Sequence, residues 1–197
     1  MKRLFDVVFS CVVLLVLLPV GIILSLLIVI ESRGGAFFKQ ERVGRYGKPF
    51  FIYKFRSMRL GAEKQGKLTI GVRDQRITRV GYFLRKFKLD EFPQFYNVLK
   101  GDMSIVGPRP EVKEYVAQYT SDQLTVLNVK PGITDYASLA FFKENELLAK
   151  SENPNKTYLE EIMPAKLALN KKYLLHRTFG QDMKIIWQTL KKILGKK

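Results

Sequence analysis

The apolar run from Leu4 to Ile30 restricts the fold more than any other feature of this chain. Its few interruptions are Asp6, Ser10, Cys11, Pro19, Gly21 and Ser25. A helix needs about 20 apolar residues to cross the core of a bilayer, so the run predicts a membrane segment. A cleaved signal peptide would have a shorter apolar region, roughly 7–15 residues, ending at a small-residue cleavage site. This run is longer and continues into a charged Glu-Ser-Arg segment, which disfavours a signal peptide.

Two features bear on how this segment sits in the membrane. Pro19, near the middle of the run, removes one helical hydrogen bond and favours a kink. Basic residues flank both ends, with Lys2 and Arg3 before the run and Arg33 and Lys39 after it. Basic flanks favour the cytoplasmic side, so a bent helix that enters and returns satisfies this preference at both ends. A straight spanning helix satisfies it at one end, and a proline is tolerated there too. The residues alone leave both topologies open.

The charge balance points to an anionic partner. The chain has 197 residues, with 34 Lys and Arg against 18 Asp and Glu, a net charge of +16. Nucleic acid, acidic lipid headgroups and phosphorylated substrates all fit such an excess. Cys11 is the single cysteine and His176 the single histidine, which excludes an intrachain disulfide and a cysteine-based metal site. Catalysis would therefore depend on carboxylates, hydroxyls or lysines.

Beyond residue 33 the pattern predicts a mixed, mostly helical α+β fold. A strand is expected over 50–55, because aromatic and β-branched residues dominate there. A loop is expected over 61–74, and residues 107–110 cannot be regular structure because they contain two prolines and a glycine. Helices are expected over 78–87, 90–101 and 111–119.

A C-terminal helix is also predicted, and its environment has two interpretations. One helical face carries Met183, Ile186, Trp187, Leu190 and Leu194, with lysines on the other. Such a helix either packs on the core or lies in the membrane interface.

Asp90 and Glu91 are the most informative pair of side chains. They are adjacent where a helix is expected to begin, and Asp at such a point is commonly only a helix cap. A helix N-terminus also binds anions, and Arg76, Arg79 and Arg85 lie nearby in sequence. A carboxylate among cations stays ionised and can attack phosphorus, while a neighbouring carboxylate can hold Mg²⁺.

Two further stretches carry candidate phosphate ligands. Arg109 lies between Pro108 and Pro110, which fix the backbone, and a guanidinium suits bidentate phosphate contact. Lys54 and Arg56 alternate with apolar residues at strand period and would share one face. A structural turn and a solvated strand face are the simpler interpretations of these two stretches.

Taken together, these stretches resemble the bacterial sugar transferase family, the monotopic phosphoglycosyl transferases. The resemblance is ordered and covers nearly the whole chain. Its motifs are Gln40 with Arg42-Val43-Gly44, Lys54-Phe55-Arg56-Ser57-Met58, Asp74 with Arg76-Ile77-Thr78, Gly81 with Leu84-Arg85, Leu89-Asp90-Glu91, Pro93-Gln94, Asn97-Val98-Leu99, Gly101-Asp102-Met103-Ser104, Val106-Gly107-Pro108-Arg109-Pro110 and Pro131-Gly132-Ile133-Thr134.

The resemblance implies a topology and a location. Residues 1–33 would form a re-entrant membrane helix bent at Pro19, and residues 34–197 a small catalytic domain with amphipathic helices in the membrane interface. The protein would belong to the bacterial inner (cytoplasmic) membrane, with the catalytic domain facing the cytoplasm.

The resemblance also implies a two-step reaction and the residues that perform it. Asp90 would attack the β-phosphate of a UDP-sugar, releasing UMP, and undecaprenyl phosphate would then displace the phospho-sugar from the enzyme. This would be the first membrane step of glycoconjugate assembly, as in exopolysaccharide or lipopolysaccharide synthesis. Glu91 would be catalytic and hold Mg²⁺. The expected phosphate ligands are Arg85, Arg109, Lys54, Arg56 and Arg76.

The sequence departs from the family where Leu18 replaces a common Ser before the proline, at Asp135-Tyr136-Ala137-Ser138, and over 141–172, which leaves the sugar open. Without the extra transmembrane helices of larger relatives, the chain is expected to be the minimal catalytic form. Its expected partners are the two substrates, the membrane and downstream glycosyltransferases but no nucleic acid, and a homodimer is left open. The alternatives are a non-catalytic anchored module that binds anionic lipid or nucleic acid, and a relative that has lost activity.

Overall fold

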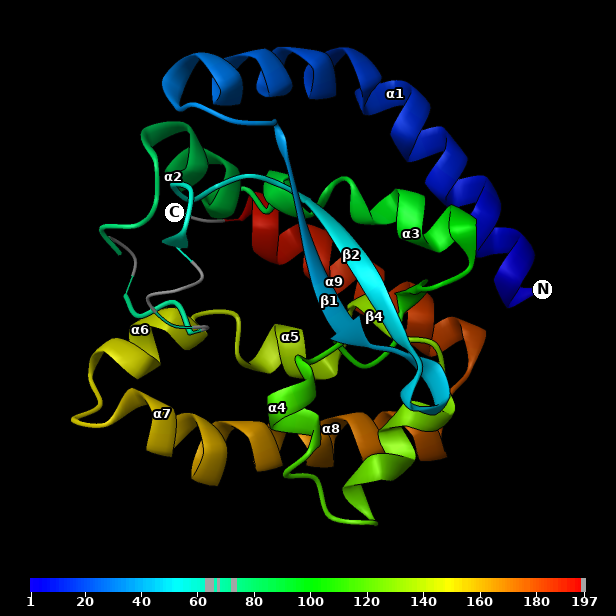
Figure 1. Cartoon of the computed structure of the whole chain (residues 1–197). Coiled ribbons are helices and arrows are strands. Elements are labelled where there is room, and N and C mark those ends of the chain that lie inside the picture. The colour runs from blue at the N-terminus through cyan, green and yellow to red at the C-terminus, as the bar shows by residue number, and fades with distance from the viewer. Residues whose placement is uncertain (63–65, 67, 72–73, 196–197) are drawn as a thin grey trace.

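Helix α1 (Lys2–Glu31) is the longest element of the fold and runs, bent, along one edge of the molecule (Figure 1). The computed structural model describes residues 1–62, 66, 68–71 and 74–195. The predicted apolar helix is confirmed, and it stays continuous through Pro19. It is long and apolar enough to cross a membrane. Its outer apolar face is exposed, as the 68% to 80% exposure of Leu15, Val16 and Ile30 shows.

The N-terminal end of α1 is fixed to the rest of the chain by polar contacts. Lys2 Nζ donates to the carbonyl oxygen of Val106 at 3.1 Å and forms an ion pair with Asp182. The buried Asp6 carboxylate accepts from Ser104 Oγ at 2.8 Å. An acidic side chain inside the apolar run is thus paired rather than exposed to lipid.

The C-terminal end of α1 is fixed to the same body. Arg56, which is buried, donates to the carbonyl oxygens of Arg33 at 2.6 Å and Ser32 at 2.8 Å. The Glu31 carboxylate accepts from the first two amides of α2 (Arg79–Lys86) at 2.6 and 2.9 Å. Both ends of the long helix therefore contact one folded unit.

The described residues form two small sheets. Strands β1 (Phe37–Val43) and β2 (Pro49–Phe55) pair antiparallel, with Phe37 opposite Phe55 and Val43 opposite Pro49. Strands β3 (Ser104–Val106) and β4 (Gly132–Thr134) pair in parallel. The predicted strand over 50–55 is confirmed, whereas β1 was not predicted from its mixed charged and aromatic sequence.

The segment from 78 to 101 holds one confirmed and one corrected helix. Thr78 caps α2 as predicted, accepting from the Gly81 amide at 2.9 Å. The helix expected from Asp90 begins later, because α3 spans Gln94–Lys100. Asp90 and Glu91 lie instead in a short 3-10 turn (Leu89–Glu91), which follows a left-handed Lys88 at φ 57°. They are therefore not at the N-terminus of an α-helix.

The helix expected over 111–119 is also shorter, since α4 spans only Lys113–Val116. Residue 111 stays extended because its carbonyl accepts from the Val43 amide at 2.9 Å. In the loop over 61–74, Ala62 is in a 3-10 conformation and the other described residues are in neither helix nor strand, while residues 63–65, 67 and 72–73 lie outside the described residues. The remaining helical elements are a 3-10 segment at Gln123–Asn128, α5 (Tyr136–Ala140), α6 (Glu144–Ala149), α7 (Pro154–Thr157), a π turn at Tyr158–Ile162, α8 (Met163–Leu175) and α9 (Phe179–Leu194), with a 3-10 turn at Arg45–Gly47.

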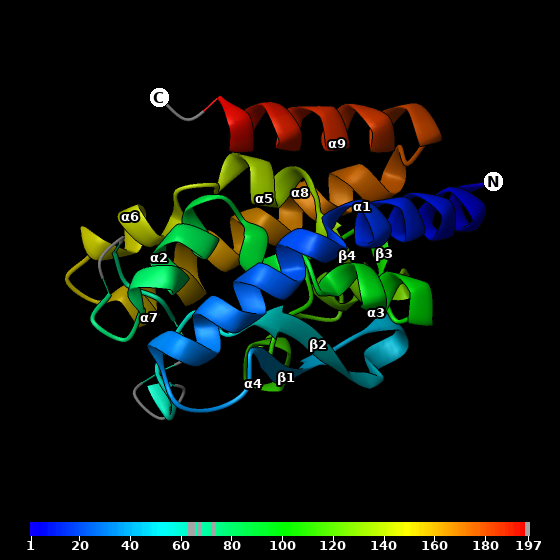
Figure 2. The ribbon, with the colours of Figure 1, turned by 90° about the horizontal axis from the view of Figure 1, so that it is seen from above.

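The C-terminal helix is confirmed, and it packs on the core along one side while part of its predicted apolar face is exposed. The inward face of α9 carries Asp182 and Ile185, while Trp187, Leu190 and Leu194 are exposed, Trp187 by 59%. Seen from above, α9 lies on one side of α1 and the β1–β2 hairpin on the other (Figure 2). Ile186 of the predicted apolar face packs against the buried core, while Trp187, Leu190 and Leu194 stay exposed.

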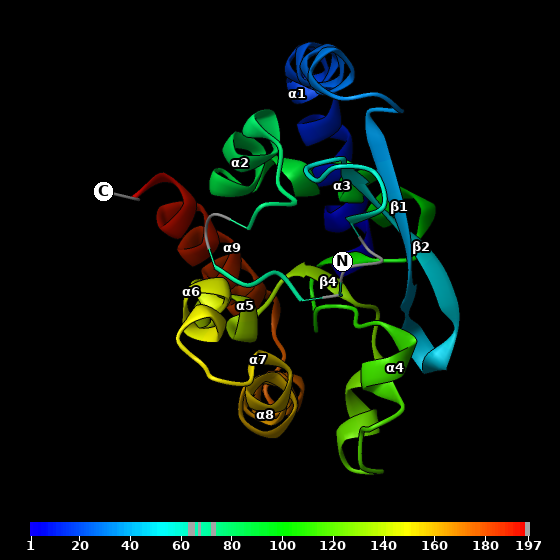
Figure 3. The same ribbon diagram turned by 60° about the vertical axis from the view of Figure 1, so that its left-hand side comes forward.

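The core lies between α1 and the helices at the opposite end of the molecule, α7 and α8 (Figure 3). One buried cluster joins β2, α3 and β3 to α9, and its members are Ile52, Val98, Met103, Ile105, Val106, Tyr173 and Ile185. Another seats the C-terminal half of α1, and its members are Leu24, Ile28, Phe55 and Leu84. Each such apolar side chain stabilises the fold by about 1.5–3 kcal/mol on burial, so α1 is packed as part of the domain.

Candidate active site

The turn at Leu89–Glu91 presents two adjacent carboxylates from a packed base. Leu89 and Phe92, on either side of the pair, pack against the cluster that seats α1. Asp90 and Glu91 are themselves only 7% and 8% exposed. Two carboxylates in such a place need cationic or hydrogen-bonded partners, because burying an unpaired charge is costly.

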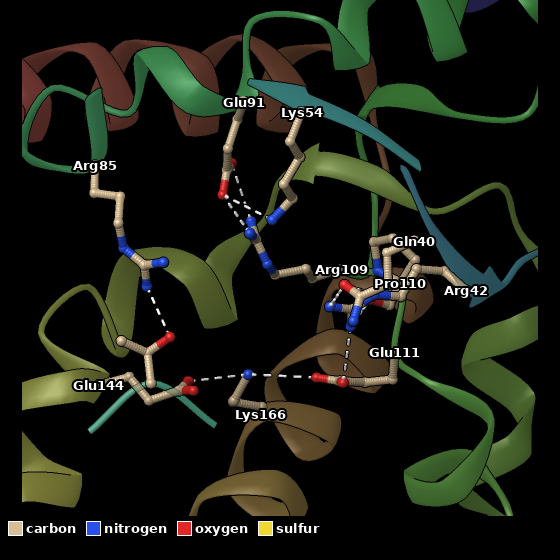
Figure 4. A network of polar contacts seen from close by, with 11 residues as sticks. Gln40, Arg42, Lys54, Arg85, Glu91, Arg109, Pro110, Glu111, Glu144 and Lys166 are labelled. Atoms are coloured by element: carbon tan, nitrogen blue, oxygen red, sulfur yellow. Dashed lines mark hydrogen bonds and ion pairs between the residues drawn. The ribbon is translucent and has the colours of Figure 1, made fainter. Parts of the chain in front are cut away.

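Arg109 and Lys54 supply those partners for Glu91 (Figure 4). Arg109 donates through both Nη atoms to the two carboxylate oxygens of Glu91, with Nη1 at 3.2 Å from Oε2. Lys54 Nζ lies 3.8 Å from Oε1 of the same carboxylate. The bidentate geometry fixes the guanidinium plane. The structure thus brings together three of the predicted residues from three separate segments.

The three charges shift one another's pKa values. Burial alone would raise the pKa of Glu91, but attraction by Arg109 and Lys54 outweighs it and holds this pKa below its ordinary value. Attraction by Glu91 raises the pKa of Arg109. Burial lowers the pKa of Lys54 to about 8, with Glu91 opposing the shift. Glu91 and Arg109 are therefore charged at neutral pH, while Lys54 titrates close to it.

Asp90 has a different environment from its neighbour. Its Oδ1 atom is buried and has no hydrogen-bond partner among the described residues. Asp90 also lines two cavities, of about 280 Å³ and 720 Å³. Lys54 and Arg85 line both cavities as well. A carboxylate with a free oxygen, surrounded by cations where two cavities meet, can act on a phosphate bound in either.

The other predicted phosphate ligands divide into two groups. Arg85 faces both cavities and is held by a 2.9 Å hydrogen bond from Nη2 to Thr69 Oγ1 (Figure 4). Arg56 also borders the larger cavity, but both its Nη atoms are bound to carbonyl oxygens at the end of α1. Arg76 binds Asp74 and the Gly66 carbonyl oxygen, at 2.7 Å, and so holds its own loop. The geometry gives Arg56 and Arg76 a structural role and leaves Arg85 available to a ligand.

Asp135 is a site residue that the sequence did not single out for a role. It is fully buried, and its Oδ2 accepts from the backbone amide of Arg109 at 3.1 Å. Its Oδ1 accepts from the Ser138 amide and so caps α5. An Asp three residues before a Ser, at the start of a short helix, is a readable capping signal, but its contact with Arg109 is not.

A second polar network, which the sequence did not predict, also lines the smaller cavity. Glu111 accepts from Tyr158 OH at 2.6 Å and from Arg42 Nη1 at 3.4 Å. Lys166 Nζ bridges Glu111, at 3.8 Å, and Glu144, at 3.0 Å (Figure 4). These groups come from four distant segments, so no local pattern marks them. They surround the cavity with hydrogen-bonding groups suited to a hydroxylated ligand.

The carboxylates can be tested against the Mg²⁺ that the resemblance implies. Among the described residues no three His, Cys, Asp or Glu side chains cluster as a protein-only metal site would need. Mg²⁺ needs only one or two carboxylates when substrate phosphates complete its shell. Asp90 has a free oxygen, and Glu91 keeps lone pairs beyond those that Arg109 occupies. The donors present therefore fit Mg²⁺ brought with a phosphorylated substrate.

Comparison with known proteins gives concordant matches. A family model described as bacterial sugar transferase matches residues 1–196. A Bacillus subtilis (strain 168) protein, provisionally named an undecaprenyl-phosphate N-acetylgalactosaminyl 1-phosphate transferase, is 46% identical over 61% of this chain and 68% of its own. The uncharacterized sugar transferase EpsL of the same organism is 37% identical over 98% of this chain and 87% of its own. The UDP-glucose:undecaprenyl-phosphate glucose-1-phosphate transferase of Escherichia coli (strain K12) is 39% identical over 82% of this chain, which spans 36% of that longer enzyme.

Proposed function

The chain belongs to the bacterial sugar transferase family, and from that premise we propose that it transfers a sugar 1-phosphate from a UDP-sugar to undecaprenyl phosphate. The relatives named above for their reactions are undecaprenyl-phosphate sugar phosphotransferases, which supports a transferase of this type. The observation that carries the proposal is the position of Asp90, a buried carboxylate with a free oxygen at the junction of two cation-lined cavities.

Asp90 is the nucleophile in this proposal. One carboxylate oxygen attacks the β-phosphorus of the UDP-sugar, the bond from that phosphorus to the bridging oxygen breaks, and UMP leaves with the bond's electron pair. The sugar phosphate is then an acyl phosphate on Asp90. A phosphate oxygen of undecaprenyl phosphate attacks the same phosphorus, the bond to the carboxylate breaks, and Asp90 is restored as the diphosphate lipid leaves. Neither step needs a histidine, because phosphoryl transfer depends mainly on positioning and charge neutralisation.

Lys54, Arg85 and Arg109 provide that neutralisation. All three line the smaller cavity together with Asp90 and Glu91. Arg109 is held at two points, because its guanidinium binds Glu91 and its backbone amide donates to the Asp135 carboxylate. Its position is therefore fixed before a substrate arrives. Mg²⁺, held by Glu91 and Asp90 with the donor's phosphates, would supply additional positive charge when bound.

The same proposal places residues 1–33 in the membrane as a re-entrant helix and residues 34–197 on the cytoplasmic side of the bacterial inner membrane. The polar contacts of both ends of α1 with one folded unit support a helix that returns to the side it left. The bare apolar faces of α1 and α9 support contact with lipid. A site at the interface limits water, which would otherwise hydrolyse the phosphorylated Asp90.

Replacement of Asp90 by Asn tests the proposal. The full-length Asp90→Asn variant, with a panel of UDP-sugars and undecaprenyl phosphate, should release no UMP above background, since loss of a nucleophile costs on the order of 10⁶-fold in a serine protease. Mass spectrometry of the wild type with donor alone should find one sugar phosphate on the peptide that contains residue 90. The control is Asp122→Asn, since Asp122 is exposed and ion-paired with Lys171 away from the site. Normal turnover by the Asp90 variant would refute the assignment.

A further inference from the structure

A separate cavity of about 370 Å³ lies at the N-terminal end of α1. It shares no lining residue with the two cavities at Asp90. Cationic side chains from four segments line it, and they are Lys2, Arg3, Arg45, Lys130 and Arg177. The one acidic lining residue, Asp6, is already bound to Ser104 Oγ and the Ile105 amide. The proposed reaction uses none of these groups.

Most of these cations have no carboxylate partner. Lys2 is paired with Asp182. Arg3 donates to the uncharged carbonyl oxygens of Val98 and Leu99 at the end of α3. Arg45 likewise donates to a carbonyl oxygen, that of residue 128, and to a tyrosine hydroxyl. Lys130 and Arg177 have no hydrogen bond or ion pair with another described residue.

Two of these cations, Arg3 and Lys130, lie close to each other. A Cβ placed on Gly101 would stand 3.6 Å from both Arg3 Nη2 and Lys130 Nζ. Burial, and next the repulsion of Arg3 and Arg45, lower the pKa of Lys130, and the carboxylates of Asp6 and Asp102 oppose this shift only in part. Like charges held around an open cavity stabilise the fold only when an anion joins them. Guanidinium groups with an ammonium beside them suit the oxygens of a phosphate group.

We propose that this cavity binds a phosphate group, the chemistry that an anionic lipid headgroup or free inorganic phosphate presents. Its surroundings favour the lipid. Leu4 adjoins Arg3, and Leu175 and Phe179 flank Arg177, and these three apolar side chains are 69%, 79% and 48% exposed. Phe179 packs edge-on against Phe5 of α1, with ring centroids 5.3 Å apart, so both elements share one apolar surface. A phospholipid whose phosphate occupies the cavity would thus have its acyl chains beside α1.

Binding to purified full-length protein in a neutral detergent tests the site. Native mass spectrometry measures the bound fraction of phosphatidylglycerol against phosphatidylcholine, and calorimetry measures inorganic phosphate. The double variant K130Q/R177Q should bind phosphatidylglycerol, or inorganic phosphate if that is the ligand, at least about tenfold more weakly than the wild type does, a change of about 1.4 kcal/mol. The single variant K130Q should lie between the double variant and the wild type. The conservative K130R/R177K should bind like the wild type.

The matched control removes the same charge elsewhere. Lys150 and Lys184 are exposed and lie outside this cavity, so K150Q/K184Q should bind like the wild type. Preference for phosphatidylglycerol that is lost only in the cavity variants identifies a lipid headgroup. The same dependence for inorganic phosphate identifies free phosphate. Absence of binding to either probe, or equal loss in the cavity and control variants, overturns the site. Since UMP release depends on Asp90, either proposal can fail without the other.

Discussion

The Glu91 carboxylate helps to keep Lys54 charged at neutral pH. Because the pKa of Lys54 is about 8, a small rise in pH above neutrality removes this charge. Burial lowers the pKa of Lys54 to about 8, and without the carboxylate 3.8 Å away the shift would be larger. Above pH 8 the amine loses its proton, and with it the charge proposed to bind the donor's phosphates. An ordinary lysine, with a pKa near 10.4, would show no such change below pH 9.

Donor use should therefore fall as pH rises through about 8. The measurement is kcat/KM for the UDP-sugar from pH 6.5 to 10. Lys54→Arg keeps its charge over this whole range, so its decline should move up by more than about one pH unit. If Lys54→Arg and the wild type decline together, another group titrates. Lys150→Arg, exposed and outside both cavities at Asp90, controls for the substitution itself.

Replacing Glu91 by Gln should affect both stability and the pH profile. The amide leaves the Arg109 guanidinium without its carboxylate, which costs about 1–3 kcal/mol for a largely buried pair. It also removes the attraction that opposes the effect of burial on Lys54, so donor use should fail at a pH below that of the wild type. Thermal unfolding and kcat/KM measure the two effects. Glu152→Gln, exposed on the surface, should change neither.

At the level of single residues, the sequence predicted which side chains would share one site better than it predicted their individual contacts. Asp90, Glu91, Lys54 and Arg109 were predicted, the last two partly from residue type and partly through family motifs, and the fold brings them together. The strand period predicts that Arg56 shares one face with Lys54, and the family resemblance implies that both bind phosphate. Arg56 turns instead to the carbonyls that end α1, a contact across more than 20 residues that periodicity cannot reveal.

Among the elements, α1 contacts the turn at Leu89–Glu91 through Gly21, which packs against Phe92. A Cβ at this position would stand 3.3 Å from Phe92 Cε1, and Phe92 directly follows the Asp90-Glu91 pair. The closeness of Phe92 favours a glycine at this buried position, although glycine disfavours a helix by about 1 kcal/mol relative to alanine. The close approach lets α1 support the turn.

A bulky residue at 21 should consequently impair catalysis from outside the site. Gly21→Leu forces Phe92 to move, an overpacking that costs about 1–3 kcal/mol, and the displaced turn should lower kcat more than it raises the KM for the donor. Gly35→Leu is the control, because nothing lies within 4 Å of a Cβ there. Wild-type kcat in Gly21→Leu, with membrane binding retained, would show that the turn is positioned independently of α1.

Element boundaries were predictable only where local signals determine them. Thr78 caps α2 and Gly101 ends α3 at φ 94°, both as their residue types indicate. The start of α3 was misjudged because Lys88 adopts a left-handed conformation that its residue type does not announce. For α9, the helix and its apolar face were evident, but not that Asp182 faces inward to meet Lys2 and Tyr173.

For the whole molecule, the polar contacts at the two ends of α1 favour the proposed re-entrant topology over a spanning helix. Separating either end from the domain would break these ion pairs and hydrogen bonds, of which those of Lys2 and Arg56 are part-buried and each contribute about 0.5–3 kcal/mol, while the Glu31 contact with α2 is exposed. A straight spanning helix would have to give up one set. The apolar length of α1 could not distinguish these cases, because the decisive partners, Val106, Asp182 and Arg56, lie far from α1 in sequence.

Both ends of α1 should therefore be reached from one side of the membrane. In a Cys11→Ser background, a cysteine at position 35 follows the helix, and a protease site placed before Met1 precedes it. A cysteine at position 152 marks the catalytic domain. In inverted inner-membrane vesicles, an impermeant maleimide should label positions 35 and 152, and protease should cut before Met1, without detergent. In right-side-out vesicles all three should be protected until detergent is added. Opposite accessibility of the protease site and position 35 would establish a spanning helix, and the contacts of Lys2 with Val106 and Asp182 could then not form in the membrane.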